Sequence, residues 1–364
     1  MAQNLGSLKV AIVHDWLVGG GAELVVLELH KMFPGAPIYT SYSTKEWRQK
    51  MDDKVVTGYL QHLGRFRKFL PMLRQHWFSH LNFEGFDLVI SSSGAEAKGI
   101  RVPASTKHIN YCHSPTHYYW SRYEEYLENP GFGAFNWLAR LGLKVLVGPM
   151  RRWDYKAAQR PDSIIANSGY IKDQVKKYYG RDATVVHPPV PIERFTKLDQ
   201  ARSGFVVAGR QTAYKRFDLA VAACTKLGLK LTVLGKGPDH ARLVAMAGPS
   251  VTFIEEASDQ AMVDNIQTAQ AFIFAGLDDF GIVAVEALAA GTPLIAYKDG
   301  GALDYVEPGV TGVFFEEQTV ESLCAALQAF KPSKFDPLRV HQAATQYSAA
   351  FFQINMRRCL EEAF

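Results

Sequence analysis

Short runs of β-branched residues alternate with helical patterns along nearly the whole chain. In the first half these runs are KVAIV, APIYT, DLVISSS, KHINYCH, SIIANS and ATVVHPP, and in the second half they are GFVVAG, KLTVLG, VTFIEE, AFIFAG, PLIAY and GVFF. This alternation is typical of parallel sheets whose strands are joined by crossover helices. Because 364 residues exceed the usual size of one domain, the sequence predicts two doubly wound α/β domains.

The segment between the two series of strands marks the predicted domain boundary. HPPVPIERFTKLDQARSG, at 187–204, contains three prolines and several charges, as linkers often do. We therefore predict a first domain over 1–190, a linker over 191–203 and a second domain over 204–344. The amphipathic pattern of 345–364 predicts a terminal helix that can return to the first domain. Since open α/β sheets bind ligands beyond the carboxyl ends of their strands, the two domains are expected to face each other across a cleft.

The composition excludes several classes of protein. With 48% hydrophobic and 21% charged residues the chain is neither disordered nor fibrous, and a net charge of +4 is too small to indicate nucleic-acid binding. The four cysteines show no CxxC spacing, so neither a zinc site nor a disulfide framework is indicated. No apolar stretch reaches the ~18 residues of a spanning helix, and the first apolar run is too short for a signal peptide. We expect a cytoplasmic protein that meets a membrane only at its surface.

The stretch LDDFGIVAVEALAAGTPLIAY, at 277–297, predicts a loop, a helix and a strand, with Gly291 ending the helix. Backbone amides at the start of a helix bind phosphate well. These amides belong to Phe280, Gly281 and Ile282. Glu286, about one turn further on, is placed to accept hydrogen bonds from vicinal sugar hydroxyls, and Asp278 projects from the loop on the same side. Alternatively, Asp278 and Asp279 only cap the helix and Glu286 is solvated.

A second candidate element is VVAGRQTAYKRFDLAV, in which a strand ends and a loop leads into a helix. Arg210 and Lys215 flank this loop. Two cations at this spacing can converge on one diphosphate, arginine through its fork of N–H donors and lysine as a point charge. The alternative is that both side chains are simply solvated.

A glycine-rich turn, HDWLVGGGAELVVLELH, follows the first strand. Gly19, Gly20 and Gly21 lack the GxGxxG spacing of dinucleotide-binding folds, and no acidic residue follows in the expected way. The cluster therefore indicates a close approach of the backbone to a ligand, or else only a tight structural turn.

The stretch NYCHSPTHYYW places His113 just beyond a predicted strand. A histidine in this position can donate a hydrogen bond to a substrate hydroxyl, although a structural role is the alternative. The aromatic residues that follow it are either core or a platform for an apolar or sugar ligand.

A basic stretch, from Lys54 to Phe83, contains no aspartate or glutamate up to residue 83. Its aromatic and apolar residues recur at helical spacing, and basic residues flank them. This pattern is typical of a helix that lies in an anionic membrane interface. The predicted membrane-binding residues are Arg65, Arg67, Lys68, Arg74 and Trp77. The alternative is that the apolar stripe packs in the core and the cations form a solvated face.

Together these motifs resemble the family 4 retaining glycosyltransferases, which have the GT-B architecture of two facing Rossmann-like domains. The resemblance covers essentially the whole chain. It is most specific in the E-x(7)-E region, which here begins with Asp278 and continues into EALAAGTPLIA. In addition, CHSPTHYYW is similar to the CHTPxRYxW of bacterial mannosyltransferases of surface-glycan assembly, with His117 in place of the arginine.

The resemblance implies a role for each matching residue of the second domain. Glu286 would hold the donor ribose, and Asp278, one methylene shorter than the usual glutamate, would contact the donor sugar. The amides of 280–282 would meet the sugar and the diphosphate. Arg210 and Lys215 would neutralise the charge of the diphosphate.

In the first domain, the cleft histidine of the family matches His113 and its glycine turn matches Gly20 and Gly21. The implied reaction is sugar transfer with retention at the anomeric carbon, without a metal ion or another cofactor. The cations and helix amides would stabilise the leaving diphosphate, whose departing oxygen would take the proton of the acceptor hydroxyl.

The implied donor is a nucleotide-diphosphate sugar, either GDP-mannose or a UDP-sugar, with mannose favoured. The implied acceptor is a lipid-linked glycan at the cytoplasmic face of an anionic membrane, and no nucleic acid is involved. Two alternatives stay open: a transferase with a soluble acceptor, and a catalytically silent partner that only binds nucleotide sugars, which the aspartate at 278 suggests. A nicotinamide-dependent dehydrogenase is disfavoured by the missing dinucleotide fingerprint.

Overall fold

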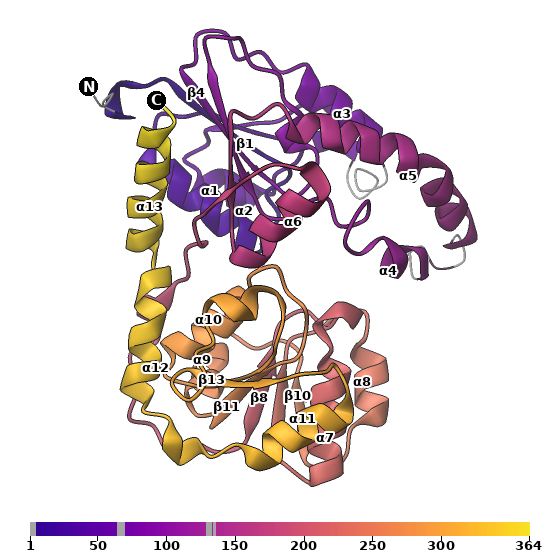
Figure 1. Cartoon of the computed structure of the whole chain (residues 1–364), viewed down its shortest axis with the longest axis vertical. Coiled ribbons are helices and arrows are strands. Elements are labelled where there is room, and N and C mark those ends of the chain that lie inside the picture. The colour runs from indigo at the N-terminus through magenta and orange to yellow at the C-terminus, as the bar shows by residue number, and fades with distance from the viewer. Residues whose placement is uncertain (1–4, 64–69, 129–132, 134–135) are drawn as a thin grey trace. The chain divides into compact units, whose positions relative to one another are not determined.

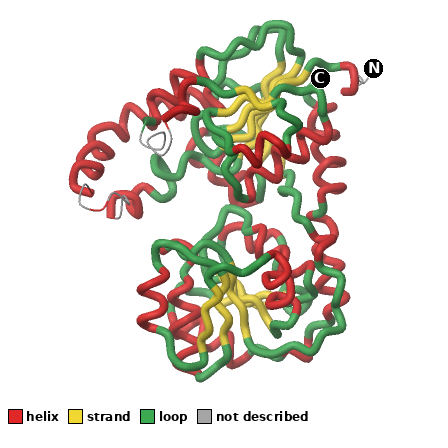
Figure 2. The backbone as a smooth tube through the Cα atoms, turned by 180° about the vertical axis from the view of Figure 1, so that it is seen from behind, coloured by secondary structure: helices red, strands yellow, loops and turns green. Residues whose placement is uncertain are grey.

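The structure is a computed structural model that describes residues 5–63, 70–128, 133 and 136–364. The chain divides into two compact units. Unit 1 comprises Met1–Pro188 and Phe352–Phe364, and unit 2 comprises Pro189–Phe351. Each unit contains a parallel β-sheet with helices packed around it (Figures 1 and 2). The predicted α/β class with two Rossmann-like domains is confirmed.

Unit 1 has a seven-stranded sheet in the order β3-β2-β1-β4-β5-β6-β7, with parallel pairing throughout the described strands. The strands are β1 (Val10–His14), β2 (Ile38–Thr40), β3 (Val55–Val56), β4 (Leu88–Ser93), β5 (Lys107–Cys112), β6 (Ser163–Ala166) and β7 (Thr184–Val185). The helices around it are α1 (Gly21–Met32), α2 (Lys45–Lys50), α3 (Pro71–Ser79), α4 (Tyr123–Glu128), α5 (Asn136–Ala158) and α6 (Gly169–Tyr179).

Local sequence signals set several of these elements. All five residues of β1 are buried, as expected for a strand covered on both faces. Helix α6 begins after Ser168, whose hydroxyl accepts a hydrogen bond from the amide of Ile171, and ends at Gly180 in the left-handed conformation. The C-terminal helix, α13 (Ala349–Glu362), places Phe352, Met356 and Leu360 in the same apolar cluster as β1 and α1.

Unit 2 has a six-stranded parallel sheet in the order β10-β9-β8-β11-β12-β13. The strands are β8 (Phe205–Ala208), β9 (Leu231–Leu234), β10 (Val251–Ile254), β11 (Ala271–Phe274), β12 (Leu294–Tyr297) and β13 (Gly312–Phe315). The helices are α7 (Phe217–Leu227), α8 (His240–Met246), α9 (Asp259–Gln267), α10 (Ile282–Ala289), α11 (Val320–Ala329) and α12 (Pro337–Ala344).

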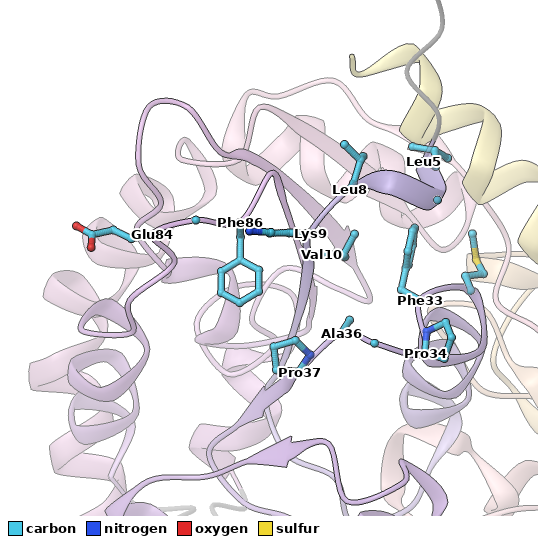
Figure 3. A pocket seen from close by; sticks show the side chains of 14 residues that line it. Leu5, Leu8, Lys9, Val10, Phe33, Pro34, Ala36, Pro37, Glu84 and Phe86 are labelled. Atoms are coloured by element: carbon cyan, nitrogen blue, oxygen red, sulfur yellow. The ribbon is translucent and has the colours of Figure 1, made fainter.

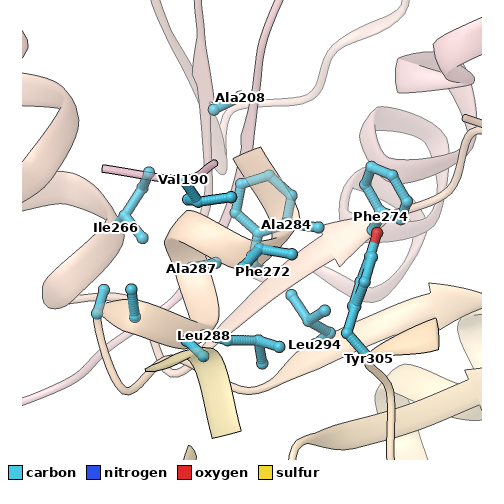
Figure 4. Close-up of a cluster of buried hydrophobic side chains, with 14 of the residues drawn as sticks. Val190, Ala208, Ile266, Phe272, Phe274, Ala284, Ala287, Leu288, Leu294 and Tyr305 are labelled. Atoms are coloured by element: carbon cyan, nitrogen blue, oxygen red, sulfur yellow. The ribbon is translucent and has the colours of Figure 1, made fainter. Parts of the chain in front are cut away.

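The core of unit 2 lies on both faces of this sheet. On one face Phe272 and Leu294 from the strands meet Ala287 and Leu288 from α10, and all four side chains are completely buried (Figure 4). Residues 191–203, interpreted above as a linker, fall within unit 2, where the neighbouring Val190 and the segment's own Phe195 are buried in this cluster.

The strand order of unit 2 determines where a ligand is expected. Strands β8 and β11 are neighbours, but the chain leaves β8 toward β9 on one side and leaves β11 toward β12 on the other. The connections after two such strands run to opposite sides of the sheet, and the carboxyl ends of these strands are the usual ligand site of an open α/β sheet. The two motifs predicted to bind a diphosphate follow β8 and β11, so the topology brings them to the same edge.

Candidate functional site

The start of α10 lies at the position predicted from the sequence. Gly281 precedes the helix with φ +89°, and Gly291 follows it with φ +68°. A Cβ atom on Gly281 would lie 2.4 Å from Cζ of Phe274 and 2.8 Å from the hydroxyl of Tyr305. The Tyr305 hydroxyl donates to the carbonyl oxygen of Phe280 at 2.7 Å. The backbone amides at this helix start are therefore held in one place, which suits a phosphate-binding site.

The loops after β8 and β11 meet through an ion pair. The Nζ of Lys215, from a 3₁₀ turn over Ala213–Lys215, lies 2.8 Å from Oδ2 of Asp278. Their side chains are 20% and 9% exposed. The backbones also touch, because a Cβ atom on Gly276 would lie 2.7 Å from Cα of Lys215. Arg210 is exposed just beyond β8. The cation and the carboxylate that the sequence singled out are thus direct partners.

Glu286 has a neighbour that the sequence did not reveal. Its Oε1 lies 3.6 Å from Nη1 of Arg194, which belongs to a 3₁₀ turn over Ile192–Arg194. The Glu286 side chain is 12% exposed. Burial raises the pKa of its carboxyl group, the positive charge of Arg194 lowers it, and the negative charge of Asp259 raises it again, with a net rise. A largely buried carboxylate on α10, about one turn beyond its start, can accept hydrogen bonds from a ligand.

In unit 1, some backbone amides of the glycine turn that precedes α1 are bonded to a side chain of the same helix. The carboxylate of Glu23 accepts hydrogen bonds from the amides of Val18 at 3.1 Å and Gly19 at 2.9 Å. Glu23 is 4% exposed, and a Cβ atom on Gly20 would lie 3.1 Å from its Oε2. This arrangement favours a structural turn at Gly19, while ligand contact by Gly20 and Gly21 stays a prediction.

His113 lies at the carboxyl end of β5, beside two other strand ends. Its Nε2 is 2.7 Å from Oγ of Ser92 in β4. Nδ1 of His14, the last residue of β1, is 2.7 Å from the carbonyl oxygen of the same serine, and the two imidazole rings are 6.1 Å apart. The side-chain amide of Asn167 donates through Nδ2 to the carbonyl oxygen of His113 at 3.0 Å. His14 was missed, although it ends its strand as polar residues of a ligand site often do.

Comparison with known proteins identifies the family. The family described as Glycosyltransferase Family 4 matches residues 19–194, and the one described as Glycosyl transferases group 1 matches residues 191–347. The chain belongs to the family 4 glycosyltransferases. This membership agrees with the resemblance seen in the sequence motifs.

Relatives of this family 4 member have several activities. A protein of Mycobacterium sp. (strain JLS) named D-inositol 3-phosphate glycosyltransferase is 28% identical over 224 residues, which is 54% of this chain and 51% of the relative. A glycogen synthase of Mycobacterium tuberculosis is 27% identical over 203 residues, 51% of this chain and 49% of the relative. The chain thus spans about half the length of the curated relatives it matches.

Solved structures of GT-B proteins share the fold of this chain. HepE of Anabaena, determined in complex with UDP, has a TM-score of 0.68 at 15% identity, covering 98% of this chain and 100% of that one. The sucrose-phosphate synthase of Thermosynechococcus elongatus has a TM-score of 0.68 at 16% identity, covering 97% and 98%. At such identities the likeness establishes the architecture.

The prediction that Arg74 and Trp77 bind a membrane is wrong, because both are buried in unit 1, at 2% and 9% exposure. Nε and Nη2 of Arg74 donate to the two carboxylate oxygens of Glu96 at 2.8 and 2.9 Å. Tyr118 donates to Glu96 at 2.8 Å as well. Here Trp77 packs in the core and Arg74 forms a buried ion pair, while Leu73 on the same helix is 39% exposed. Arg65, Arg67 and Lys68 lie outside the described residues.

The aromatic residues after His113 are mainly core. Tyr119 is 2% exposed, and the Trp120 indole donates to Asp154 at 2.7 Å. Within the described part of the chain, no group of three or more His, Cys, Asp or Glu is placed to hold a metal ion. Nor is any described helix long and apolar enough to cross a bilayer.

One hollow in the described part of the chain lies away from these motifs. It has a volume of about 620 Å³ and opens at the amino end of β1, between Leu5, Phe33, Pro34 and Phe86 (Figure 3). The candidate ligand residues follow the carboxyl ends of the strands. A much smaller hollow, of about 10 Å³, is lined in part by Lys215 and Asp278.

Proposed function

We propose that this protein transfers a hexose, with mannose favoured, from a nucleotide-diphosphate sugar to a lipid-linked glycan at the cytoplasmic face of an anionic membrane. One observation carries the proposal of a donor site. At the carboxyl ends of β8 and β11, Lys215 pairs with Asp278, and the Asp278 loop leads into α10, which starts after Gly281 and carries the largely buried Glu286. These are the groups that a diphosphate, a sugar and a ribose require.

In the proposed mechanism each group acts on one part of the donor. Lys215 and Arg210 neutralise the diphosphate, whose negative charge grows as the bond to the sugar breaks. The amides at the start of α10 donate to the same oxygens. Glu286 accepts hydrogen bonds from the ribose hydroxyls, and Asp278 contacts the sugar. Cations of the chain thereby take the place of a metal ion.

The acceptor hydroxyl attacks the anomeric carbon from the face that the diphosphate leaves. The departing phosphate oxygen takes the proton of this hydroxyl, so the new bond forms with retention and no enzymic nucleophile is used. His113, held against Ser92, is proposed to donate a hydrogen bond to a substrate hydroxyl. The structures of HepE with UDP and with UDP-glucose support a nucleotide-sugar donor for a protein of this fold.

A second candidate is transfer to a water-soluble acceptor. The curated relatives named D-inositol 3-phosphate glycosyltransferase favour it. The two candidates differ in the acceptor and share the donor site.

The test is a transfer assay without divalent metal. The protein is incubated in EDTA with GDP-mannose, UDP-glucose or UDP-N-acetylglucosamine and with either a polyprenyl-diphosphate-linked glycan or inositol 3-phosphate. Product mass is measured by mass spectrometry and the anomeric configuration by NMR. We expect a retained product on the lipid-linked glycan, lost in Asp278→Ala. Product on inositol 3-phosphate alone establishes the second candidate, and donor binding without any transfer overturns both.

A further inference from the structure

The first half of α5 buries little of its surface against the rest of unit 1. The buried residues of α5 are Met150, Asp154, Ala157 and Ala158, all in its second half. Between Asn136 and Pro149 no residue is buried. In Figures 1 and 2 this half of the helix extends away from the sheet of unit 1, with α4 beside it. The first half of α5 is thus presented mainly to the surroundings of unit 1.

The exposed side chains of this half form one apolar face. Trp137 is 65% exposed, Leu138 52%, Leu141 54% and Val145 65%. At 100° per residue, these four positions fall within an arc of about 100° on the helix surface. Large exposed apolar patches on single chains mark interaction sites. We call these four residues the α5 apolar face.

Cations flank the α5 apolar face. Arg140 and Lys144 follow one edge of it, Arg152 continues its line, and no aspartate or glutamate occurs between Asn136 and Trp153. Arg151 lies at the same edge, but its guanidinium donates to the carbonyl oxygen of Tyr119. The neighbouring helix α4 carries three exposed acidic residues, Glu124, Glu125 and Glu128. The end of α4 is tied to α5, since the Arg140 guanidinium donates to the carbonyl oxygens of Leu127 and Glu128. On α5 itself the only charges around the apolar face are positive.

We propose that the α5 apolar face lies in the headgroup region of an anionic phospholipid membrane. An exposed apolar arc bordered by lysine and arginine suits the boundary between lipid tails and negative headgroups. Tryptophan, found here at the start of the face, is enriched at that boundary. A second copy of the chain fits less well, because a two-fold contact would bring the same cations together. The proposal rests on the membrane association in the proposed function and assigns the surface that provides it.

The second half of α5 fixes the helix to the candidate acceptor side of unit 1. Asp154, completely buried, accepts hydrogen bonds from Trp120 at 2.7 Å and Tyr179 at 2.6 Å, and Nζ of Lys98 lies 2.7 Å from it. Lys98 follows β4, the strand that carries Ser92. Trp120 follows β5, the strand that ends just before His113. A membrane bound along α5 therefore constrains the orientation of these strand ends, where a lipid-linked acceptor is proposed to react.

The experiment is sedimentation of the full chain with vesicles of phosphatidylcholine alone or of phosphatidylcholine and phosphatidylglycerol in a 3:1 ratio. An apolar-face variant carries Trp137→Ser, Leu141→Ser and Val145→Ser. A charge variant carries Lys144→Glu and Arg152→Glu. A control variant carries Leu338→Ser and Ile354→Ser, which replace side chains that are 58% and 55% exposed elsewhere.

We expect the wild type to bind phosphatidylglycerol vesicles and the apolar-face variant to bind at least tenfold more weakly. The charge variant should lose about fivefold or more per cation and show less dependence on salt. The control variant should bind like the wild type. Unchanged melting temperature and unchanged nucleoside diphosphate binding in all variants would show that the fold and the donor site are intact, so this test is independent of the transfer assay.

Three results overturn the proposal. The first is a wild type that does not sediment with phosphatidylglycerol vesicles. The second is an apolar-face variant that binds like the wild type while Arg65→Glu, Arg67→Glu and Lys68→Glu together abolish binding, which would assign the membrane contact to the other basic stretch. The third is a wild-type dimer in analytical ultracentrifugation that the apolar-face variant converts to a monomer without any change in lipid binding.

Discussion

Replacement of Glu286 by glutamine tests two effects of this carboxylate separately: its effect on the stability of the fold and its proposed contribution to ligand binding. The side chain is 12% exposed, and its charge has Arg194 at 3.6 Å as the neighbouring cation. Burial raises the pKa of Glu286 despite that cation, and the charge of Asp259 adds to the rise. Glutamine has nearly the same shape and keeps one acceptor oxygen, but it carries no charge.

The expected loss of ligand affinity follows from one charge-assisted hydrogen bond. A hydrogen bond to a charged group contributes about 1.5–3 kcal/mol, which corresponds to about 10- to 150-fold in Kd. We therefore expect Glu286→Gln to weaken nucleoside diphosphate binding by that factor. The loss should come from the ribose hydroxyls, so inorganic pyrophosphate should bind equally well to both proteins.

The stability of the protein should change in the opposite direction. Because the pKa of Glu286 is higher in the folded than in the unfolded protein, the native state holds this proton more tightly. Protonated Glu286 therefore stabilises the folded state fully at a pH below its pKa in the unfolded protein. This stabilisation is lost as the pH rises through its pKa in the folded protein. At pH 7 the buried charge therefore opposes folding, and Glu286→Gln should raise the melting temperature. The difference should shrink as the pH falls toward the ordinary range of a glutamate.

The assays are isothermal titration with UDP and GDP and thermal unfolding between pH 4 and pH 8. Glu321→Gln is the matched control, since that side chain is 76% exposed in the same unit, and it should change neither quantity. Unchanged nucleotide affinity in Glu286→Gln would refute the ribose contact. A lower melting temperature at pH 7 would refute the argument from burial and show that Arg194 depends on the carboxylate.

Three further substitutions test the ion pairs and the helix start. Arg74→Ala should lower the free energy of unfolding by about 3–5 kcal/mol in urea titration, because it leaves Glu96 buried without its cation, and vesicle binding should stay unchanged. Lys215→Met should lower the free energy of unfolding, because it leaves the carboxylate of Asp278 without its cation. Adding Asp278→Asn should restore the stability but not the nucleotide affinity. Full nucleotide affinity in the double variant would contradict the proposed binding of the diphosphate by Lys215. Gly281→Ala should cost about 1–2 kcal/mol for its left-handed conformation alone, with weaker nucleotide binding by calorimetry.

The elements that the sequence predicted well are those with local signals. The helix after residue 281 has glycine at both ends and helix formers between, and the structure ends it within two residues of the expected positions. The loops holding Lys215 and Asp278 were joined through the family resemblance, and the ion pair between them agrees with it, since both loops follow parallel strands that end at the same edge of the sheet. Local chemistry was sufficient for the helix.

Contacts that depend on packing could not be predicted. Arg194 reaches Glu286 because Val190 and Phe195 on either side of it are buried in the core of unit 2, and no residue spacing encodes that contact. The basic stretch containing Arg74 was misassigned for a related reason. An apolar stripe with cations has the same composition whether it faces lipid or packs against a buried glutamate, and only the structure shows the partner.

Among the departures from the family pattern, we expect the aspartate at 278 to matter most for specificity. Its loop has little freedom to move, since Cβ atoms placed on Gly276, Gly300 and Gly301 would lie only 2.4–2.7 Å from backbone atoms of the neighbouring loop segments. Packing this close leaves the backbone no room to compensate for a missing methylene group. The shorter side chain lies 2.8 Å from Lys215, so a diphosphate beside that lysine must share it with the carboxylate. A donor sugar must therefore approach the Asp278 loop more closely than it would approach a glutamate, which makes this position the one we expect to select the sugar.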